Sequence, residues 1–240
     1  MTTGTQRGAV RSPSRRASHT VKRALDVVAA AAGLLLASPL LAVTAIAVRA
    51  TMGSPVLFRQ VRPGLHGRPF RIIKFRTMRA PRPGEVWHRT DAERVTRLGR
   101  LLRATSLDEL PELWNVLRGE MSLVGPRPLL MEYLAEYTPE EWRRHDVLPG
   151  ITGWAAVNGR CNLELRDRFK LDVWYVDHWS LWLDLRILAR TAIQVVRRQD
   201  VFPERELKVL GLGDQDRDVE GTSWMKQKAP SGANTGERGT

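Results

Sequence analysis

Two adjacent carboxylates, Asp108 and Glu109, stand in the segment Ser106-Leu107-Asp108-Glu109 and could serve as a nucleophile or as metal ligands. Ser106 and Glu109 have the spacing of a capping box, so the two acids are expected to open a helix. Acids are also common in first turns because they complement the helix dipole, and that explanation requires no catalysis. At a helix start both carboxylates should stay ionised at pH 7, as a nucleophile must.

The residues around this pair favour phosphate chemistry. Arginines occur on both sides of it, namely Arg97, Arg100, Arg103 and Arg118. The turn 125–128 (GPRP) then presents the Arg127 guanidinium on a backbone stiffened by two prolines. A guanidinium fork matches phosphate oxygens well. Carboxylates among arginines therefore indicate phosphoryl transfer, in which one group attacks and cations neutralise the developing charge.

A metal ion at this site would be bound by oxygen. The five histidines are scattered and no Cys/His cluster has zinc-ligand spacing. Asp108 and Glu109 are the candidate ligands, and carboxylates favour Mg²⁺ or Mn²⁺. The single cysteine, Cys161, excludes an internal disulfide and fits a reducing compartment. It is interpreted as a bystander, since nothing near it in sequence should lower its pKa.

The elements expected to position these residues form a small α/β unit. Residues 56–61 and 69–76 are predicted strands, joined by the turn PGLHGR into a β-hairpin. Helices are predicted at about 92–103 and 107–118, the second ended by Gly119.

The second half of the chain is predicted to be mostly helical. Thr138-Pro139-Glu140-Glu141 has the pattern of a helix start. Residues 149–160 are glycine-rich and predict a loop, and residues 163–198 predict one long or two short helices. Their Trp174, Trp179, Trp182, Leu181, Leu185 and Leu188 either cover a surface in the membrane interface or pack in the core.

An uncharged run of 22 residues, Val27 to Val48, predicts a membrane segment. A straight helix of this length would extend about 33 Å, enough to cross a ~30 Å hydrocarbon core once. However, Ser38-Pro39 lies in the middle, where proline breaks the hydrogen-bond pattern. Both flanks are also basic, which favours keeping both ends in the cytoplasm. We therefore favour a re-entrant helical hairpin, broken at Ser38 and Pro39, over a single span.

The net charge of +12 is concentrated around this membrane segment. Residues 1–84 contain fifteen Lys or Arg and one acid, whereas residues 85–240 sum to about −2. Basic residues that flank an apolar segment indicate binding to an anionic bilayer. A nucleic-acid-binding protein would instead carry its positive charge on the folded domain, so no nucleic-acid partner is expected.

The sequence resembles the bacterial sugar transferase family, the monotopic polyprenyl-phosphate phosphoglycosyl transferases. The similarity covers about residues 22–198 and matches the short form of the family. Its motifs are KRALD (22–26), RPGLHGRPF (62–70), KFRTM (74–78), LLRATSLDELPELWNVLRGEMSLVGPRPLL (101–130), LPGITGWAAVNGR (148–160) and LDVWYV (171–176).

This resemblance implies a fold and a reaction. The fold is a re-entrant N-terminal membrane helix hairpin on a small, mainly helical α/β catalytic domain with interfacial amphipathic helices, at the cytoplasmic face of the inner membrane. In the reaction, Asp108 attacks a UDP-sugar, releases UMP and carries a covalent phosphosugar, which passes to undecaprenyl phosphate. Mg²⁺ near Asp108 and Glu109 would offset phosphate charge.

The resemblance also suggests further site residues. Arg103 and Arg127 are candidate phosphate ligands, and Lys74 and Arg76 could meet the lipid phosphate. Asn158, Arg160 and Asp172 could line the nucleotide or sugar pocket.

The expected domain organisation is a disordered basic tail (1–20), a membrane helix (21–50), a catalytic domain (51–200) and a mostly disordered tail (201–240). The alternative to an enzyme is a membrane-anchored, non-catalytic scaffold that binds lipids and a partner. That reading leaves the acid pair beside arginines unexplained. The transferred sugar, the glycan pathway and the oligomeric state are not evident from the sequence.

Overall fold

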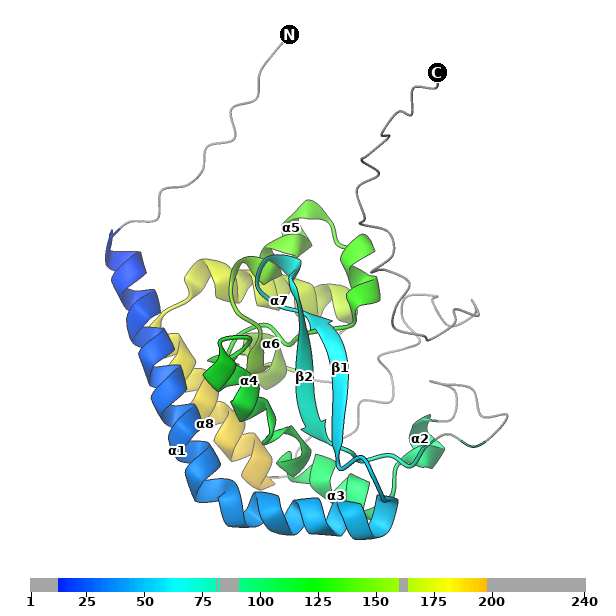
Figure 1. Cartoon of the computed structure of the whole chain (residues 1–240). Coiled ribbons are helices and arrows are strands. Elements are labelled where there is room, and N and C mark those ends of the chain that lie inside the picture. The colour runs from blue at the N-terminus through cyan, green and yellow to red at the C-terminus, as the bar shows by residue number, and fades with distance from the viewer. Residues whose placement is uncertain (1–12, 81, 83–90, 160–163, 198–240) are drawn as a thin grey trace, which may run out of the picture.

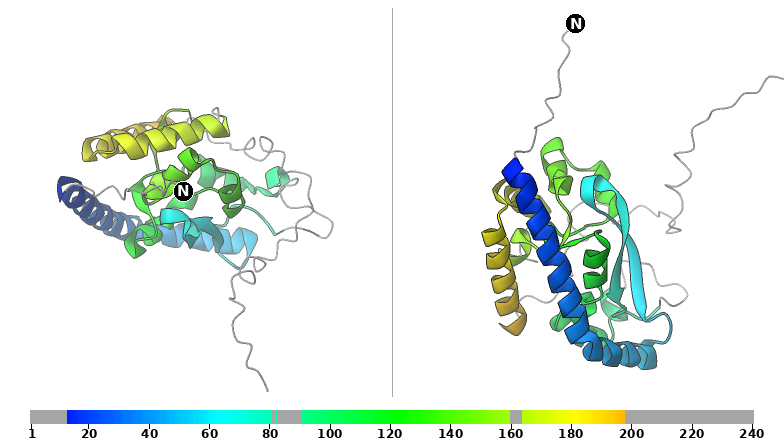
Figure 2. Two further views of the ribbon diagram at one scale, coloured as in Figure 1. Left: turned by 90° about the horizontal axis from the view of Figure 1, so that it is seen from above. Right: turned by 60° about the vertical axis from the view of Figure 1, so that its left-hand side comes forward.

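The computed structural model describes residues 13–80, 82, 91–159 and 164–197. Its first element, α1 (Pro13–Met52), is a bent helix that wraps one side of the molecule (Figure 1). Pro39 lies inside this helix, and the Ser38 hydroxyl donates a 2.8 Å hydrogen bond to the Leu35 carbonyl. A proline and a serine bonded back to its own helix both cause bending. The two arms diverge at the bend and do not fold back against each other (Figure 2).

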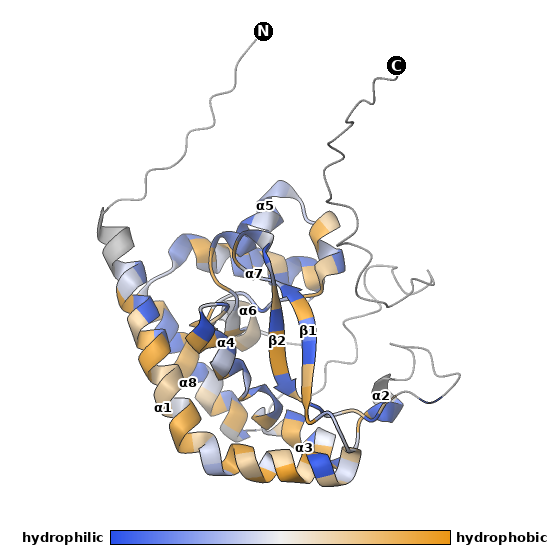
Figure 3. Ribbon diagram, in the orientation of Figure 1, coloured by the Kyte–Doolittle hydropathy of each residue, from blue (hydrophilic) through white to orange (hydrophobic). Residues whose placement is uncertain are grey.

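One side of α1 packs on the rest of the protein, and the other is apolar and exposed (Figure 3). Ala30 on the first arm and Val48 on the second are fully buried. Leu35 and Leu36, by contrast, are 74% and 81% exposed. The segment Ser18–Met52 is long and apolar enough to cross a membrane, which makes membrane association plausible.

The predicted β-hairpin is confirmed. Strands β1 (Leu57–Pro63) and β2 (Pro69–Phe75) are antiparallel and are joined through the 3₁₀ turn η1 (Leu65–Gly67). Phe70 and Ile72 of β2 pack in one core cluster with Ala30 of α1. The hairpin thus fixes Lys74, near the end of β2, relative to the inner side of α1.

The single helix predicted at 92–103 is wrong. The structure has α2 (Asp91–Arg94) and α3 (Arg97–Ala104), separated at Val95, which bridges Met78 in an antiparallel pairing. The Thr96 hydroxyl caps α3 by accepting from the Gly99 amide at 2.9 Å. Because this pairing joins residues distant in sequence, helix periodicity alone does not reveal it.

The helix predicted at 107–118 is divided as well. The 3₁₀ turn η2 (Leu107–Glu109) comes first, and α4 (Glu112–Arg118) follows and ends at Gly119 as expected. Ser106 is left-handed, with φ of 55°, and makes no side-chain cap. The predicted Ser106–Glu109 capping box is therefore wrong.

A second, two-stranded sheet lies where only a loop was predicted. Strand β3 (Ser122–Val124) pairs in parallel with β4 (Gly150–Thr152). A side chain at Gly125 would place its Cβ 2.3 Å from the Leu148 carbonyl oxygen, so glycine is required for this close approach. The sheet brings the 125–128 turn next to the residues that follow β4.

The remaining elements cover the second half of the chain. They are η3 (Met131–Ala135), α5 (Pro139–Trp142), η4 (Arg143–Asp146), α6 (Trp154–Val157), α7 (Leu165–His178) and α8 (Leu181–Arg197). The capping box predicted at Thr138 is confirmed at the start of α5. The last two helices confirm the helical prediction for 163–198 within the described residues.

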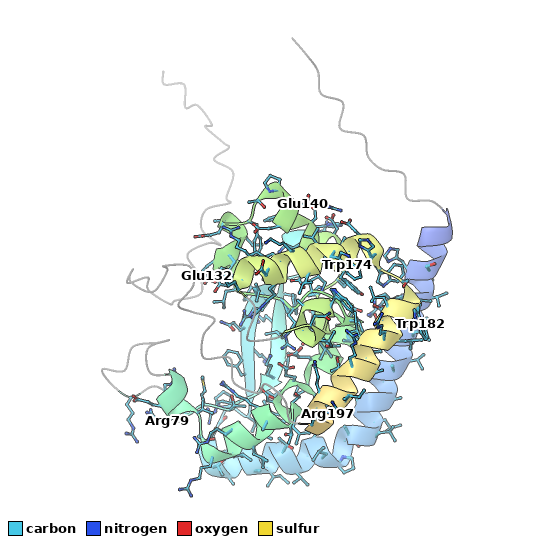
Figure 4. All side chains as sticks on the ribbon, turned by 180° about the vertical axis from the view of Figure 1, so that it is seen from behind. Arg79, Glu132, Glu140, Trp174, Trp182 and Arg197 are labelled. Atoms are coloured by element: carbon cyan, nitrogen blue, oxygen red, sulfur yellow. The ribbon has the colours of Figure 1, made fainter. Side chains whose placement is uncertain are left out.

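The tryptophans of these last helices lie partly on the surface. Trp182 of α8 is 75% exposed, and Trp174 of α7 is partly exposed near the corner where the two helices meet (Figure 4). Trp179 packs beside a core cluster instead.

The predicted disordered tails fall mostly outside the described residues. Residues 1–12 and 201–240 cannot be compared with that prediction. Residues 13–20, also placed in the tail, form the first turns of α1.

Candidate active site

The acid pair lies in η2, between α3 and α4, and faces the end of β2. Left-handed backbone is unusual for a serine, and the Ser106 amide donates to the Arg103 carbonyl while its own carbonyl accepts from the Glu109 amide. This tight turn holds Asp108 and Glu109 in one 3₁₀ turn close to Lys74 and Arg127.

Glu109 is clamped by two cations. Arg127 binds both of its carboxylate oxygens, with Nη1 3.0 Å from Oε2 and Nη2 in contact with Oε1. Lys74 Nζ donates to Oε1 at 2.8 Å. Burial alone would raise the pKa of Glu109, but the charges of Arg127 and Lys74 outweigh it and hold this pKa well below its ordinary value. Glu109 is therefore anionic across the physiological range.

Asp108 is buried, with 8% of its surface exposed. Burial and the neighbouring Glu109 raise its pKa above the ordinary value, against the opposing charges of Lys74, Arg103 and Arg127. A carboxylate in such an environment is poorly hydrated and more basic than a surface one. These properties suit a nucleophile directed at phosphorus.

A third carboxylate, Glu112, was not among the predicted site residues. It is fully buried at the start of α4, and its Oε1 lies 3.0 Å from Lys74 Nζ. Burial is the main cause that raises its pKa to about 7, with Lys74 opposing and Glu109 adding to the shift. The sequence spacing could have indicated Glu112 as a site residue, because a residue three positions after Glu109 lies on the same side of a helical segment.

Lys74 is placed between these two carboxylates. Burial disfavours its ammonium form, but the charges of Glu109 and Glu112 outweigh that cost and raise its pKa above the ordinary value. The lysine predicted to meet a lipid phosphate is thus at the centre of the acid cluster.

Arg103 reaches the site from α3. Its Nε donates to the Thr77 hydroxyl at 3.1 Å, just beyond the end of β2. The close packing of α3 on this segment depends on Gly99, where an added Cβ would lie 1.9 Å from the Thr77 carbonyl oxygen. Sequence reasoning identified Arg103 but not Thr77 or Gly99.

The backbone of Arg127 is held by a buried ion pair, Arg144–Asp172. Its side chain donates to the carbonyl of Ile151 in β4, and its own carbonyl accepts from Arg144 at 2.8 Å. Arg144 in turn binds Asp172 at 2.7 Å, and both are almost fully buried. The structure thus places Asp172 behind Arg127, paired with Arg144.

Two other predicted site residues, Arg76 and Asn158, lie apart from this cluster. Arg76 donates to the carbonyls of Met52, Gly53 and Ser54 at the end of α1. Asn158 is exposed beyond α6, where its amide donates to the Trp154 carbonyl and accepts from Arg190. Arg160 lies outside the described residues.

The oxygen donors of the site fit Mg²⁺ only in part. No group of three or more His, Cys, Asp or Glu within the described ranges is arranged to hold a metal ion. Mg²⁺ does not require such a cage, because it commonly binds one or two carboxylates together with substrate phosphates and water. Asp108 offers carboxylate oxygens, whereas both oxygens of Glu109 are already bonded to Arg127 or Lys74.

Comparison with known proteins places this chain in a recognised family. The family model described as bacterial sugar transferase matches residues 17–198. The chain is 53% identical over 176 residues to the uncharacterized sugar transferase EpsL of Bacillus subtilis, covering 73% of this chain and 87% of that protein.

Two further relatives carry names that state a reaction. One is the UDP-glucose:undecaprenyl-phosphate glucose-1-phosphate transferase of Caulobacter vibrioides, 46% identical over 75% of this chain and 72% of that protein. The other is the undecaprenyl-phosphate galactose phosphotransferase of Salmonella typhimurium, 36% identical over 79% of this chain and 43% of that protein.

Proposed function

The chain belongs to the bacterial sugar transferase family, and from this premise we propose that it transfers a sugar phosphate from a UDP-sugar to undecaprenyl phosphate. The names of two relatives support this reaction class, and they differ in the sugar, glucose in one and galactose in the other. The product would be a diphosphate-linked lipid sugar that initiates membrane-linked glycan or exopolysaccharide synthesis.

In the first step, a carboxylate oxygen of Asp108 attacks the sugar-linked phosphorus of the donor. The bond between this phosphorus and the oxygen that bridges it to UMP breaks, UMP leaves, and an acyl phosphate joins Asp108 to the sugar phosphate. The raised pKa and burial of Asp108 support its role as nucleophile. Arg103 and Arg127 would neutralise charge on the phosphate oxygens.

In the second step, a phosphate oxygen of undecaprenyl phosphate attacks the same phosphorus. The acyl–phosphate bond breaks, the Asp108 carboxylate is regenerated, and the sugar phosphate is left on the lipid. Lys74 is proposed to bind phosphate oxygens during this exchange, since its ammonium contacts Glu109 beside Asp108.

Mg²⁺, bound through Asp108 or Glu109 oxygens and donor phosphates, would neutralise phosphate charge. Asp172 is proposed to act indirectly, by holding Arg144 beneath Arg127. Arg76 is proposed to fix the end of α1 close to the lipid phosphate. Asn158 and Arg160 remain proposed contacts of the nucleotide or sugar.

The protein is proposed to be monotopic, at the cytoplasmic face of the inner membrane, with α1 re-entrant. The exposed apolar side of α1 supports contact with lipid acyl chains. Basic residues near its ends would favour an anionic bilayer.

The observation that carries the proposal is the buried Asp108 beside Glu109, with Lys74, Arg103 and Arg127 close enough to influence its pKa.

Replacing Asp108 by Asn should reduce UMP release at least 1,000-fold, because the amide cannot attack phosphorus. Detergent-solubilised protein would be assayed with a UDP-sugar panel, Mg²⁺ and polyprenyl phosphate. Mass spectrometry of donor-treated wild type, quenched before lipid is added, should find a hexose-phosphate adduct on Asp108. An active Asn variant would contradict the mechanism.

A further inference from the structure

The proposed reaction gives no function to Glu112, a buried acid beside the site. Glu112 has no exposed surface, and neither of its carboxylate oxygens has a partner with hydrogen-bond geometry among the described residues. Among the residues that the structure describes, the Lys74 ammonium lies 3.0 Å from Glu112 Oε1 and is the cation in ion-pair contact with it. A buried charge is costly unless it is paired, so this carboxylate depends on Lys74.

The same ammonium is shared with Glu109. Lys74 Nζ lies 2.8 Å from Glu109 Oε1 and 3.0 Å from Glu112 Oε1, so a small movement transfers it from one carboxylate to the other. Arg127 has no such freedom, because its guanidinium also binds the Ile151 carbonyl and its backbone lies between two prolines.

This asymmetry matters because the oxygens of Glu109 are already occupied. Oε1 accepts from Lys74 and Arg127, and Oε2 accepts from Arg127. If Oε1 of Glu109 is to accept from anything that enters with the donor, one of its two cations must withdraw. Lys74 is the cation that has a second anionic partner within reach.

We propose that Glu112 is a positioning residue that acts through Lys74, holding the ammonium when it leaves Glu109 as donor phosphates enter. Oε1 of Glu109 then keeps only its bond to Arg127 and can accept a new contact, while Lys74 stays beside Asp108, ready for a phosphate oxygen. The inference rests on the proposed transferase function and adds to it a role for a residue that does not touch the reacting atoms.

A double-mutant cycle tests this role. Wild type, Glu112→Gln, Lys74→Met and the double variant would be purified in detergent. The rate of adduct formation on Asp108, the kcat and the donor KM would then be measured. Glu112→Gln keeps the side-chain shape but removes the charge, so it should lower kcat about tenfold and change the donor KM less than threefold. In the Lys74→Met background the same change should alter the remaining rate less than twofold, because neighbours that act as a unit are not additive.

Unfolding measurements provide a second readout that does not depend on activity. Lys74→Met should lower the melting temperature, because it leaves a buried carboxylate unpaired. Adding Glu112→Gln to Lys74→Met should raise the melting temperature again.

Glu112→Asp should retain more of the wild-type kcat than Glu112→Gln. As a matched control, Glu120→Gln changes a carboxylate just beyond the other end of α4, and its kcat should stay within twofold of wild type.

Two results would overturn the proposal: wild-type kcat in Glu112→Gln, or equal losses from this change in both backgrounds. A wild-type protein that forms no adduct and releases no UMP would instead contradict the proposed transferase function.

Discussion

At the scale of single residues, the site depends on geometry as well as on charge. Arg127 contacts both oxygens of Glu109 and also the Ile151 carbonyl, which requires the planar fork of a guanidinium. Arg127→Lys retains the charge but cannot make these contacts together. We expect kcat/KM for the UDP-sugar to fall about tenfold to 100-fold, which corresponds to roughly 1.4–3 kcal/mol. Arg143→Lys is the control, because Arg143 forms an exposed ion pair with Glu140. This variant should retain wild-type activity in the UMP-release assay.

The buried His145 should make the stability of the protein depend on pH. Burial, assisted by the charge of Arg144, lowers the pKa of His145 from 6.5 to about 4 in the folded protein. Above pH 6.5 the imidazole is neutral in both states. As the pH falls from 6.5 toward 4, the unfolded chain takes up a proton that the folded protein excludes. The free energy of unfolding should therefore fall by about 3 kcal/mol over this window.

Comparison of variants isolates this contribution. His145→Gln cannot take up the proton, so its unfolding free energy in urea should depend less on pH between 6.5 and 4 than that of wild type. Parallel curves for wild type and His145→Gln would refute the prediction.

The residues of the site were only partly predictable from the sequence. Arg127 could be predicted as a site residue because the turn that presents it, residues 125–128, is formed by neighbours in sequence. The structure brings its guanidinium to Glu109. Glu112 was missed because its importance depends on burial and on Lys74, a residue 38 positions earlier. Ser106 resembled a helix cap, but the tight turn between α3 and α4 requires left-handed backbone there.

At the scale of elements, local patterns predicted local structure. The β1–β2 hairpin and the start of α5 are set by turn and capping residues close in sequence. The β3–β4 pairing joins strands whose first residues are 28 positions apart. The segment that contains β4 was predicted as a loop, and no strand was predicted at β3. Three-residue strands carry too little periodicity to be recognised, so only their tertiary contacts reveal them.

Gly99 shows how one position fixes the arrangement of α3 against the segment after β2. In Gly99→Ala, the new Cβ would lie 1.9 Å from a backbone oxygen that cannot rotate away, so α3 must shift and carry Arg103 with it. We expect a loss of about 1–3 kcal/mol in unfolding free energy and reduced UMP release. Gly33→Ala is the matched control, because its Cβ would meet only the Leu113 side chain, at 3.2 Å. Equal stability of both variants would contradict this account.

At the scale of the whole molecule, the catalytic domain holds α1 at both ends. Near its start, Lys22 binds Asp184 of α8 at 2.6 Å, and buried Asp26 accepts from the Ser122 hydroxyl of β3 at 2.7 Å. At its end, Arg76 binds the carbonyl of Met52, the last residue of the helix, and the two carbonyls that follow it. Some basic residues that flank the apolar segment therefore bind protein groups, whereas the sequence suggested lipid head groups as the partners of these basic flanks.

These contacts bear on membrane topology. A folded domain lies on one side of a bilayer, so a helix bound to it at both ends must begin and end on that side. The most exposed large apolar side chains of α1, Leu35 and Leu36, lie just before Ser38-Pro39. We therefore expect the bend to enter the membrane and both ends of α1 to face the cytoplasm.

Cysteine labelling can test this topology directly. In a Cys161→Ser background, Val21→Cys and Ser54→Cys place single thiols near either end of α1, both at exposed positions. In cells with only the outer membrane permeabilised, neither thiol should react with a membrane-impermeant maleimide, and both should react once the inner membrane is opened. A spanning helix would expose one end to the periplasm, so labelling of residue 21 with protection of residue 54 would rule out re-entry. UMP release by each variant would confirm that the labelled protein keeps its fold.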